Sequence, residues 1–398
     1  MFPSHTSDDV RGTPVPLSQT SEPAALPDFR VSSPRPQFRT IWGSDSESEM
    51  QTLTVHIKWL RQKIEKDPKH PEHIITELHL KPEWTESIQN VKPVIAKEEL
   101  IPFRLSQNIG YFTKDGRIVS CISFPFKATI SDSRFAYYGA DSQYTEFRTP
   151  DAKIAGRMDT PGFPFFEEDR MYMFFPGGTS FGMYAEDGSQ LWKYESYAPV
   201  TAFSSSSGGT VAGFADGTLV SFDNSGNQTQ RFSPGGSTYE VILGAGISQD
   251  GSRIACVSGQ DKQRFVVAEK NSGHSRVIFH EYIENSQNFQ VLVKFSSDSK
   301  TVWYDAKGFL GIANLDTLKS SRIPIDGRII QIEESAVENI VFVLSRNADT
   351  YTVTAIEPSD HKLSSFSFTG SSAFIQVRGN MLFVGRDDRI SKISVSRE

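Results

Sequence analysis

The sequence predicts an all-β fold, a β-propeller of seven four-stranded blades, and three observations support this prediction. Short runs rich in β-branched and aromatic residues fill the chain after residue 109. Asp-Gly pairs, which are strong hairpin signals, interrupt these runs. Two sequence elements also recur in a fixed order at a spacing near 40 residues, a period typical of propeller blades.

The first recurring element is an apolar residue, a polar turn and a strand-forming run. Its copies start at residues 130, 166, 203, 247, 295, 332 and 375, so successive starts lie 36 to 48 residues apart. The second element follows each of the first six copies, and its best copy is residues 184–192. Two phased hairpin elements in each period indicate a four-stranded unit. We expect strands within residues 109–124 to complete the last blade, because ring closure removes exposed sheet edges.

The repeats resemble the WD40-like and quinoprotein-like (PQQ-like) β-propeller superfamily over about 290 residues, which assigns residues 109–398 to the propeller. The Trp-Asp ending and Gly-His start of WD40 repeats are absent. The resemblance to scaffolding propellers implies a non-enzymatic platform that binds a protein partner through loops on one face.

The N-terminal quarter differs in character from the repeats. Residues 1–38 are rich in proline and polar residues, and we expect them to be disordered. Residues 51–66 are predicted to form one short helix, because its apolar positions recur at helical spacing and Pro68 follows it. Residues 77–108, with three prolines among mixed charges, are predicted to be a linker.

The helix carries a specific pattern, in which these residues match a Thr-Val-x-Val-His-Ile-x-x-Leu-Arg-x-Lys motif: Thr52, Val55, His56, Ile57, Leu60, Arg61 and Lys63. With this motif, residues 39–76 resemble part of the winged-helix DNA-binding domain of OmpR/PhoB-type response regulators. The resemblance, together with the basic side chains of the helix, implies candidate DNA-binding residues. They are Thr52, His56, Lys58, Arg61 and Lys63.

A DNA-binding regulator that uses the propeller as a sensor or interaction module is therefore the alternative function. It ranks second because residues 1–38 show neither the β-platform nor the regular first helix of that family. Residues 77–82 also depart from the family's glycine-rich wing. The formal net charge of −7 further argues against a protein that is mainly a nucleic-acid binder.

No motif predicts catalysis, and we assign no catalytic, cofactor-binding or metal-binding residue and no cofactor. His70 and His73 are separated by Pro71, and the two cysteines lack the spacing of metal ligands. The segment around Trp192 resembles a tryptophan-docking motif of quinoprotein dehydrogenases, but no vicinal cysteine pair or acidic cluster accompanies it. We expect Trp192 to pack between blades, and a quinoprotein-type enzyme remains a remote alternative.

Location follows from two further features of the sequence. No apolar run approaches the roughly 20 residues of a membrane span. The first residues lack the basic and apolar regions of a signal peptide. We therefore expect a cytoplasmic protein, or a periplasmic or membrane-anchored one if the start of the chain is wrongly assigned.

Overall fold

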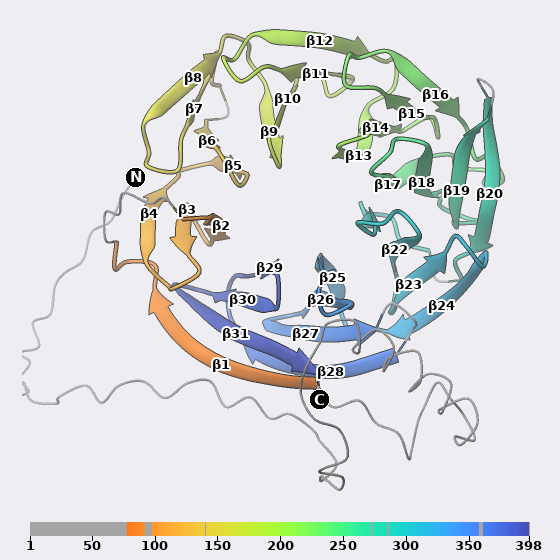
Figure 1. Ribbon diagram of the computed structural model, residues 1–398. Helices are drawn as coiled ribbons and strands as arrows, with labels where there is room; N and C mark the ends of the chain where they lie inside the picture. The colour runs from red at the N-terminus through yellow and green to blue at the C-terminus, as the bar shows by residue number, and fades with distance from the viewer. Residues whose placement is uncertain are drawn as a thin grey trace, which may run out of the picture.

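The computed structural model describes residues 78–91, 98–139, 141–271, 274–284, 286–357 and 361–397. Within these residues, 31 strands form eight antiparallel sheets that surround a central channel as the blades of a propeller (Figure 1). The all-β propeller prediction is confirmed. The predicted number of seven blades is wrong.

Blades 1 to 4 follow one another in chain order, each with its first strand nearest the channel. Blade 1 consists of β2 (Leu100–Leu105), β3 (Asn108–Thr113) and β4 (Ile118–Ser123). Blade 2 consists of β5 (Lys127–Ile130), β6 (Phe135–Tyr138), β7 (Thr145–Arg148) and β8 (Ile154–Met158). Blade 3 consists of β9 (Phe163–Glu167), β10 (Arg170–Phe174), β11 (Ser180–Tyr184) and β12 (Gln190–Glu195). Blade 4 consists of β13 (Val200–Ser206), β14 (Gly209–Phe214), β15 (Leu219–Phe222) and β16 (Gln228–Phe232).

Blades 5 to 8 continue the ring, and the last blade combines both ends of the described chain. Blade 5 consists of β17 (Ile242–Ile247), β18 (Arg253–Ser258), β19 (Arg264–Asn271) and β20 (His274–Tyr282). Blade 6 consists of β21 (Val293–Phe295), β22 (Thr301–Ala306), β23 (Phe309–Asn314) and β24 (Lys319–Pro324). Blade 7 consists of β25 (Arg328–Ser335), β26 (Ile340–Asn347), β27 (Thr350–Glu357) and β28 (His361–Thr369). Blade 8 consists of β29 (Ala373–Arg378), β30 (Met381–Arg386), β31 (Arg389–Arg397) and, as its outer strand, β1 (Leu78–Ser87).

The two recurring sequence elements are hairpins in fixed places within a blade. All seven copies of the first element form the turn between the first and second strands of blades 2 to 8. The six copies of the second element form the turn between the third and fourth strands of blades 2 to 7. In blade 5, the Ser248 hydroxyl donates to Asp250 Oδ1 at 2.6 Å and accepts from the Arg253 amide at 3.0 Å, which closes the first turn with local side chains.

These turns divide the propeller into two faces. The connection face carries the connections between successive blades and the turns between second and third strands. A hydrogen bond shows that the two kinds of segment lie on the same face: the amide of Val200, after the β12–β13 connection, donates to the carbonyl of Gly178 in the β10–β11 turn at 2.8 Å. The turn face carries the turns between first and second strands and those between third and fourth strands. In blade 6 these two turns are joined where the Leu315 amide donates to the Lys300 carbonyl at 2.8 Å.

Blade 1 breaks this arrangement, and it is the blade that the repeat count missed. Ser106, just after β2, donates its amide to Ser372 Oγ at 2.9 Å, directly before β29. Glu99, just before β2, forms an ion pair at 3.0 Å with Arg378 at the end of β29. The inner strand β2 therefore runs antiparallel to its neighbour β29. Its turn to β3 lies on the connection face, so the first repeat element does not recur in this blade.

The prediction for residues 77–108 is also wrong, because this segment holds β1 and β2 rather than a linker. The structure contains no helix within the residues it describes. Residues 1–77 lie outside the described residues, and with them the predicted disordered segment and the predicted helix at 51–66.

The ring closes where β1 pairs with β31, from Leu78 opposite Arg397 to Ser87 opposite Arg389. N-terminal sequence was predicted to close the ring, and the strand that does so is β1 rather than a strand within residues 109–124. Pro82 is accommodated because β1 is an edge strand, where a missing N–H breaks no ladder bond on the outer side.

Aromatic side chains fill the spaces between neighbouring blades. Trp84 of β1 contacts Phe383 of blade 8 and Phe112 of blade 1, with ring centroids 6.0 and 6.4 Å apart. Phe265 of blade 5 stacks on Tyr304 of blade 6 at 4.0 Å. Offset and edge-on ring pairs add to the stabilisation that buried apolar area provides.

Replacing Trp84 with alanine should lower the free energy of unfolding by about 2–4 kcal/mol, because it removes a partly buried ring that joins the closing strand to two blades. The urea midpoint measures this loss. Leu191→Ala, at an exposed position on the outer strand of blade 3, is the control and should change stability by less than about 0.5 kcal/mol. Equal losses in the two variants would contradict the role given to β1.

Candidate interaction site

The connection face exposes aromatic side chains at regular positions. Within the described residues, five successive connections between blades carry one, either in the connection or directly after it. We call this set the aromatic arc: Phe126, Phe163, Tyr197, Tyr239 and Phe289. Tyr197 is fully exposed and Tyr239 is 64% exposed. The arc runs from the edge of blade 1 to blade 6.

Neighbouring groups hold parts of the arc in place. Tyr138 of β6 lies between Phe126 and Phe163, with ring centroids 6.5 and 6.2 Å away. The Tyr239 amide and carbonyl are tied to Ser237 and to the Gln260 amide. An exposed ring with a fixed backbone loses little conformational entropy when a partner covers it.

The opposite, turn face differs in composition. The exposed large hydrophobic residues in its described turns are aliphatic, Leu318 between β23 and β24 and Val337 between β25 and β26. Scattered aliphatic residues are ordinary on protein surfaces, whereas a series of exposed aromatic residues on one face is not.

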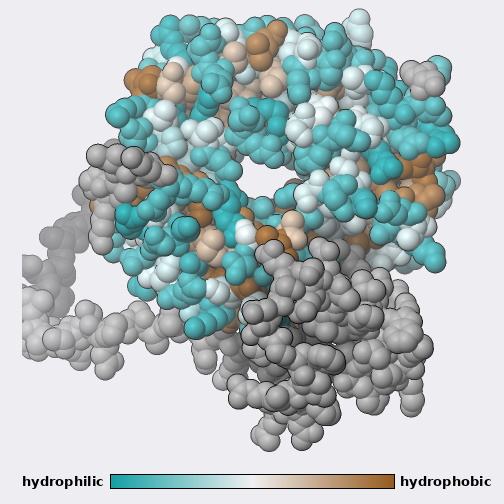
Figure 2. All heavy atoms as spheres, viewed as in Figure 1, coloured by the Kyte–Doolittle hydropathy of each residue, from teal (hydrophilic) through white to brown (hydrophobic). Residues whose placement is uncertain are grey.

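The arc ends at the last two connections, β24–β25 and β28–β29, whose described residues include no exposed aromatic side chain. Here, at the mouth of the central channel, lies a depression of about 810 Å³ lined by blades 7, 8 and 1 and by Ile130 of blade 2. We call it the mouth pocket. Figure 2 shows the channel open at its centre and ringed mostly by hydrophilic residues on the face in view.

The mouth pocket combines basic, neutral polar and apolar side chains. Its charged residues are Arg104 of β2 and Arg346 of β26, and no carboxylate is among the described residues that line it. Its neutral polar residues are Ser106, Gln107, Gln331, Ser371, Ser372 and Gln376. Its apolar wall includes Pro102, Phe103, Ile130, Ile330, Ala373 and Phe374, with Tyr351 beside them. The reversed direction of β2 brings the Ser106–Gln107 turn to this place.

A buried polar network supports the end of the arc at blades 5 and 6. The Gln263 side chain donates to the Gln287 carbonyl at 2.9 Å and accepts from the Gln287 amide at 3.0 Å, which fixes the β20–β21 connection that carries Phe289. Asp305, only 3% exposed, lies beside Gln287. Burial raises the pKa of Asp305 to about 6, while the Gln287 hydrogen bond and the charge of Arg328 act in the opposite direction.

This raised pKa makes a prediction about stability and pH. In the native state Asp305 keeps its proton to a higher pH than it does in the unfolded chain. Ionisation of Asp305 therefore lowers the free energy of unfolding progressively between about pH 4 and pH 6, and the full loss is present above pH 6. Asp305→Asn should therefore be more stable than the parent at pH 7.5, by up to roughly 3 kcal/mol, and nearly equal to it at pH 4.

Thermal unfolding at the two pH values measures this difference. Asp388→Asn, an exposed acid in the β30–β31 turn of the same face, is the matched control and should show no such change. The raised pKa of Asp305 would be contradicted if the stability gain of Asp305→Asn over the parent were smaller at pH 7.5 than at pH 4.

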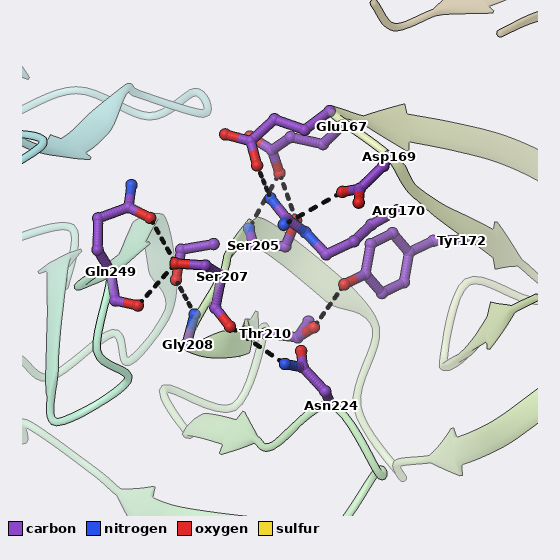
Figure 3. A network of polar contacts seen from close by, with 12 residues as sticks. Glu167, Asp169, Arg170, Tyr172, Ser205, Ser207, Gly208, Thr210, Asn224 and Gln249 are labelled. Atoms are coloured by element: carbon purple, nitrogen blue, oxygen red, sulfur yellow. Dashed lines mark hydrogen bonds and ion pairs between the residues drawn. The ribbon is translucent and has the colours of Figure 1, made fainter. Parts of the chain in front are cut away.

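A second polar network lies on the turn face between blades 3 and 4 (Figure 3). Glu167 accepts from the Ser205 hydroxyl at 2.8 Å, and Arg170 Nε donates to the same hydroxyl at 3.0 Å. Arg170 also forms an ion pair with Glu168 at 2.8 Å. Burial raises the pKa of Glu167, although both hydrogen bonds from Ser205 favour its charged form. Because Glu167 and Arg170 are consumed by contacts between blades, we interpret this network as structural.

Two sequence predictions about residues can be placed in the structure. Trp192 packs between blades as predicted: it stacks on Phe222 of blade 4 at 5.6 Å, and its Nε1 donates to the Asn224 carbonyl. The candidate DNA-binding residues Thr52, His56, Lys58, Arg61 and Lys63 lie outside the described residues.

The described part of the chain holds no group of three or more His, Cys, Asp or Glu side chains placed to bind a metal ion. None of its residues belongs to a helix that is long and apolar enough to cross a membrane.

The positions of the aromatic arc are visible in the sequence relative to the repeats. Each arc residue occurs between the end of one repeat and the start of the next, and four of the five lie outside the strands, Phe163 being the first residue of β9. The mouth pocket had no such signal, because it depends on the direction of β2 and on residues more than 200 positions apart.

The fold defines a β-propeller protein. A family profile described as beta-propeller protein matches residues 70–397, and the chain belongs to this family. A second profile, transcriptional regulatory protein, C terminal, matches residues 33–79 and confirms the predicted resemblance of that segment.

Two related sequences show the same division. An uncharacterized protein of Treponema pallidum is 28% identical over 299 residues, which is 75% of this chain and 79% of that protein. A probable transcriptional regulatory protein of Picosynechococcus is 40% identical over 81 residues, which is 19% of this chain and 32% of that protein.

Two solved structures share the fold at 12% sequence identity. BamB from Moraxella catarrhalis has a TM-score of 0.56 and covers 79% of this chain and all of its own. KlAtg21, solved in complex with the coiled-coil of AgAtg16, has a TM-score of 0.53 and covers 73% of this chain and 99% of its own. At this identity the likeness shows the propeller fold alone.

Proposed function

We propose that this protein is a non-enzymatic β-propeller that binds another protein through its connection face. The aromatic arc is the observation that carries this proposal. Aromatic side chains are enriched at the centres of protein interfaces, because each buries a large apolar area with few rotatable bonds. Five of them on one face of a closed ring would give a partner several aromatic contact points.

Two further facts support this assignment. The structural neighbour KlAtg21 was solved with a coiled-coil segment of another protein, so a related fold is used to bind a protein. The buried polar networks are occupied by contacts within and between blades, as Gln263 and Gln287 illustrate, which suits a rigid platform.

Site-specific photo-crosslinking in the cells that produce the protein tests this proposal. A benzophenone amino acid placed at Tyr197 or at Tyr239 should yield the same discrete protein adduct, since both positions project from the arc. The same group at Val337, exposed on the turn face, is the matched control and should yield no such adduct.

Mass spectrometry of the adducts identifies the partner. Equal adducts from Val337 and the arc positions would contradict binding through the connection face. The absence of a discrete adduct at both arc positions would contradict the proposal as a whole.

A second candidate function, DNA binding through residues 39–76, is favoured by the match of residues 33–79 to the C-terminal part of transcriptional regulatory proteins. In this function the propeller would serve as the sensor or interaction module. Leu78 opens β1, so the matched segment leads directly into the strand that closes the ring.

A gel-shift assay with the full chain tests the second candidate. Duplex binding should weaken steeply with salt, and Arg61→Ala should reduce it, because a phosphate contact is lost. Arg389→Ala, on the propeller surface, is the control and should leave binding unchanged. No shift at low salt would exclude this function.

A further inference from the structure

We infer that the mouth pocket binds an acidic segment of the partner protein, one that carries carboxylate side chains next to an apolar side chain. This inference rests on the proposed function and adds the chemistry of the partner. The juxtaposition that carries it is two arginines, Arg104 of blade 1 and Arg346 of blade 7, in the lining of one pocket that also carries apolar side chains.

The charge of the pocket is opposite to that of the chain. The whole chain has a formal net charge of −7, yet the charged residues that line the pocket are Arg104 and Arg346. No carboxylate is among the lining residues that the structure describes. Two acids border the pocket: Asp349, 89% exposed, lies 3.9 Å from Arg346, and Asp387 accepts hydrogen bonds from the lining residues Ser371 and Ser372. Such a local positive region in an acidic protein selects an anionic group.

Both arginines are held in place while most of their donors stay uncommitted. Arg104 lies over the Phe124 ring at 5.4 Å and donates to the Ala128 carbonyl at 3.3 Å. Arg346 lies over the Tyr351 ring at 5.2 Å and donates to the Ala348 carbonyl at 2.7 Å. A guanidinium has five N–H donors, so each can still form a paired hydrogen bond with a carboxylate. The ring contacts reduce the entropy lost on binding.

The remaining lining supports a peptide rather than a small ion. The volume of about 810 Å³ is far larger than an inorganic anion needs and lies in the range of pockets that hold drug-sized ligands. Ile130, Ile330 and Ala373 are partly exposed and provide apolar surface. Gln107 and Gln376 provide amide groups that can pair with a peptide backbone. The pocket also adjoins the connection face, where the arc would hold the rest of the partner.

The test uses the full chain and an array of eight-residue peptides, each with four acidic residues and one or two apolar residues in varied order. A second array replaces Glu and Asp with Gln and Asn. Members of the acidic array should bind and should weaken with salt. The double variant Arg104→Gln, Arg346→Gln should weaken the best peptide by about tenfold or more, because charge-assisted hydrogen bonds are lost.

Arg389→Gln is the control, since it removes one arginine charge, half of what the double variant removes, from an exposed position on the same face outside the pocket. It should leave peptide affinity within about twofold, as expected for an exposed charge. Circular dichroism and thermal unfolding should show that the double variant keeps the fold.

Three results would overturn the inference: no preference for the acidic array, equal weakening by the control variant, or displacement of the peptide by an equal concentration of inorganic phosphate. The last would identify a small-anion site instead. If the arc positions still cross-link to one partner while these peptides fail, the inference falls and the proposed function stands. If the peptides bind but the arc yields no adduct, the proposed function fails instead.

Discussion

The pairing of β1 with β31 is the contact on which the rest of the molecule depends. It joins strands about 300 positions apart in the chain and gives blade 8 its outer strand. Without it, blade 8 would lose its outer strand, and the contacts by which Trp84 joins blades 8 and 1 would be lost. Ring closure also sets the spacing of every connection, and thus the positions of the exposed aromatic side chains.

The same closure explains the irregular blade. The chain leaves β1 at the connection face and enters β2 at the turn face, so β2 must run opposite to β29. This reversal places the turn after β2 beside Ser372 and brings Arg104 next to the residues of blades 7 and 8. The direction of β2 therefore places a pocket with basic and amide groups where the aromatic arc ends.

The hairpins of blades 2 to 8 could be predicted because local sequence determines them. The Ser248–Asp250 turn closes through bonds within five residues, so its copies can be recognised from sequence and mark the right hairpins. Asp-Gly pairs were less uniform: the pair at 250–251 closes a hairpin, whereas the pair at 326–327 connects two blades. Blade 1 was missed because its inner strand lacks the repeat turn, and β1 was read as a linker because its prolines suggested irregular chain.

The sequence by itself determined the all-β class, the phase of the hairpins in blades 2 to 8, the packing of Trp192 between blades and the relationship of residues 33–79 to transcriptional regulatory proteins. These follow from local turn chemistry, side-chain pattern and shared ancestry. Only the tertiary structure decided the number of blades, the closing strand, the direction of β2 and the presence of Arg104 and Arg346 in one pocket. Those features depend on contacts between strands that are far apart in the sequence. Such contacts form only in the closed ring and produce no repeating sequence pattern.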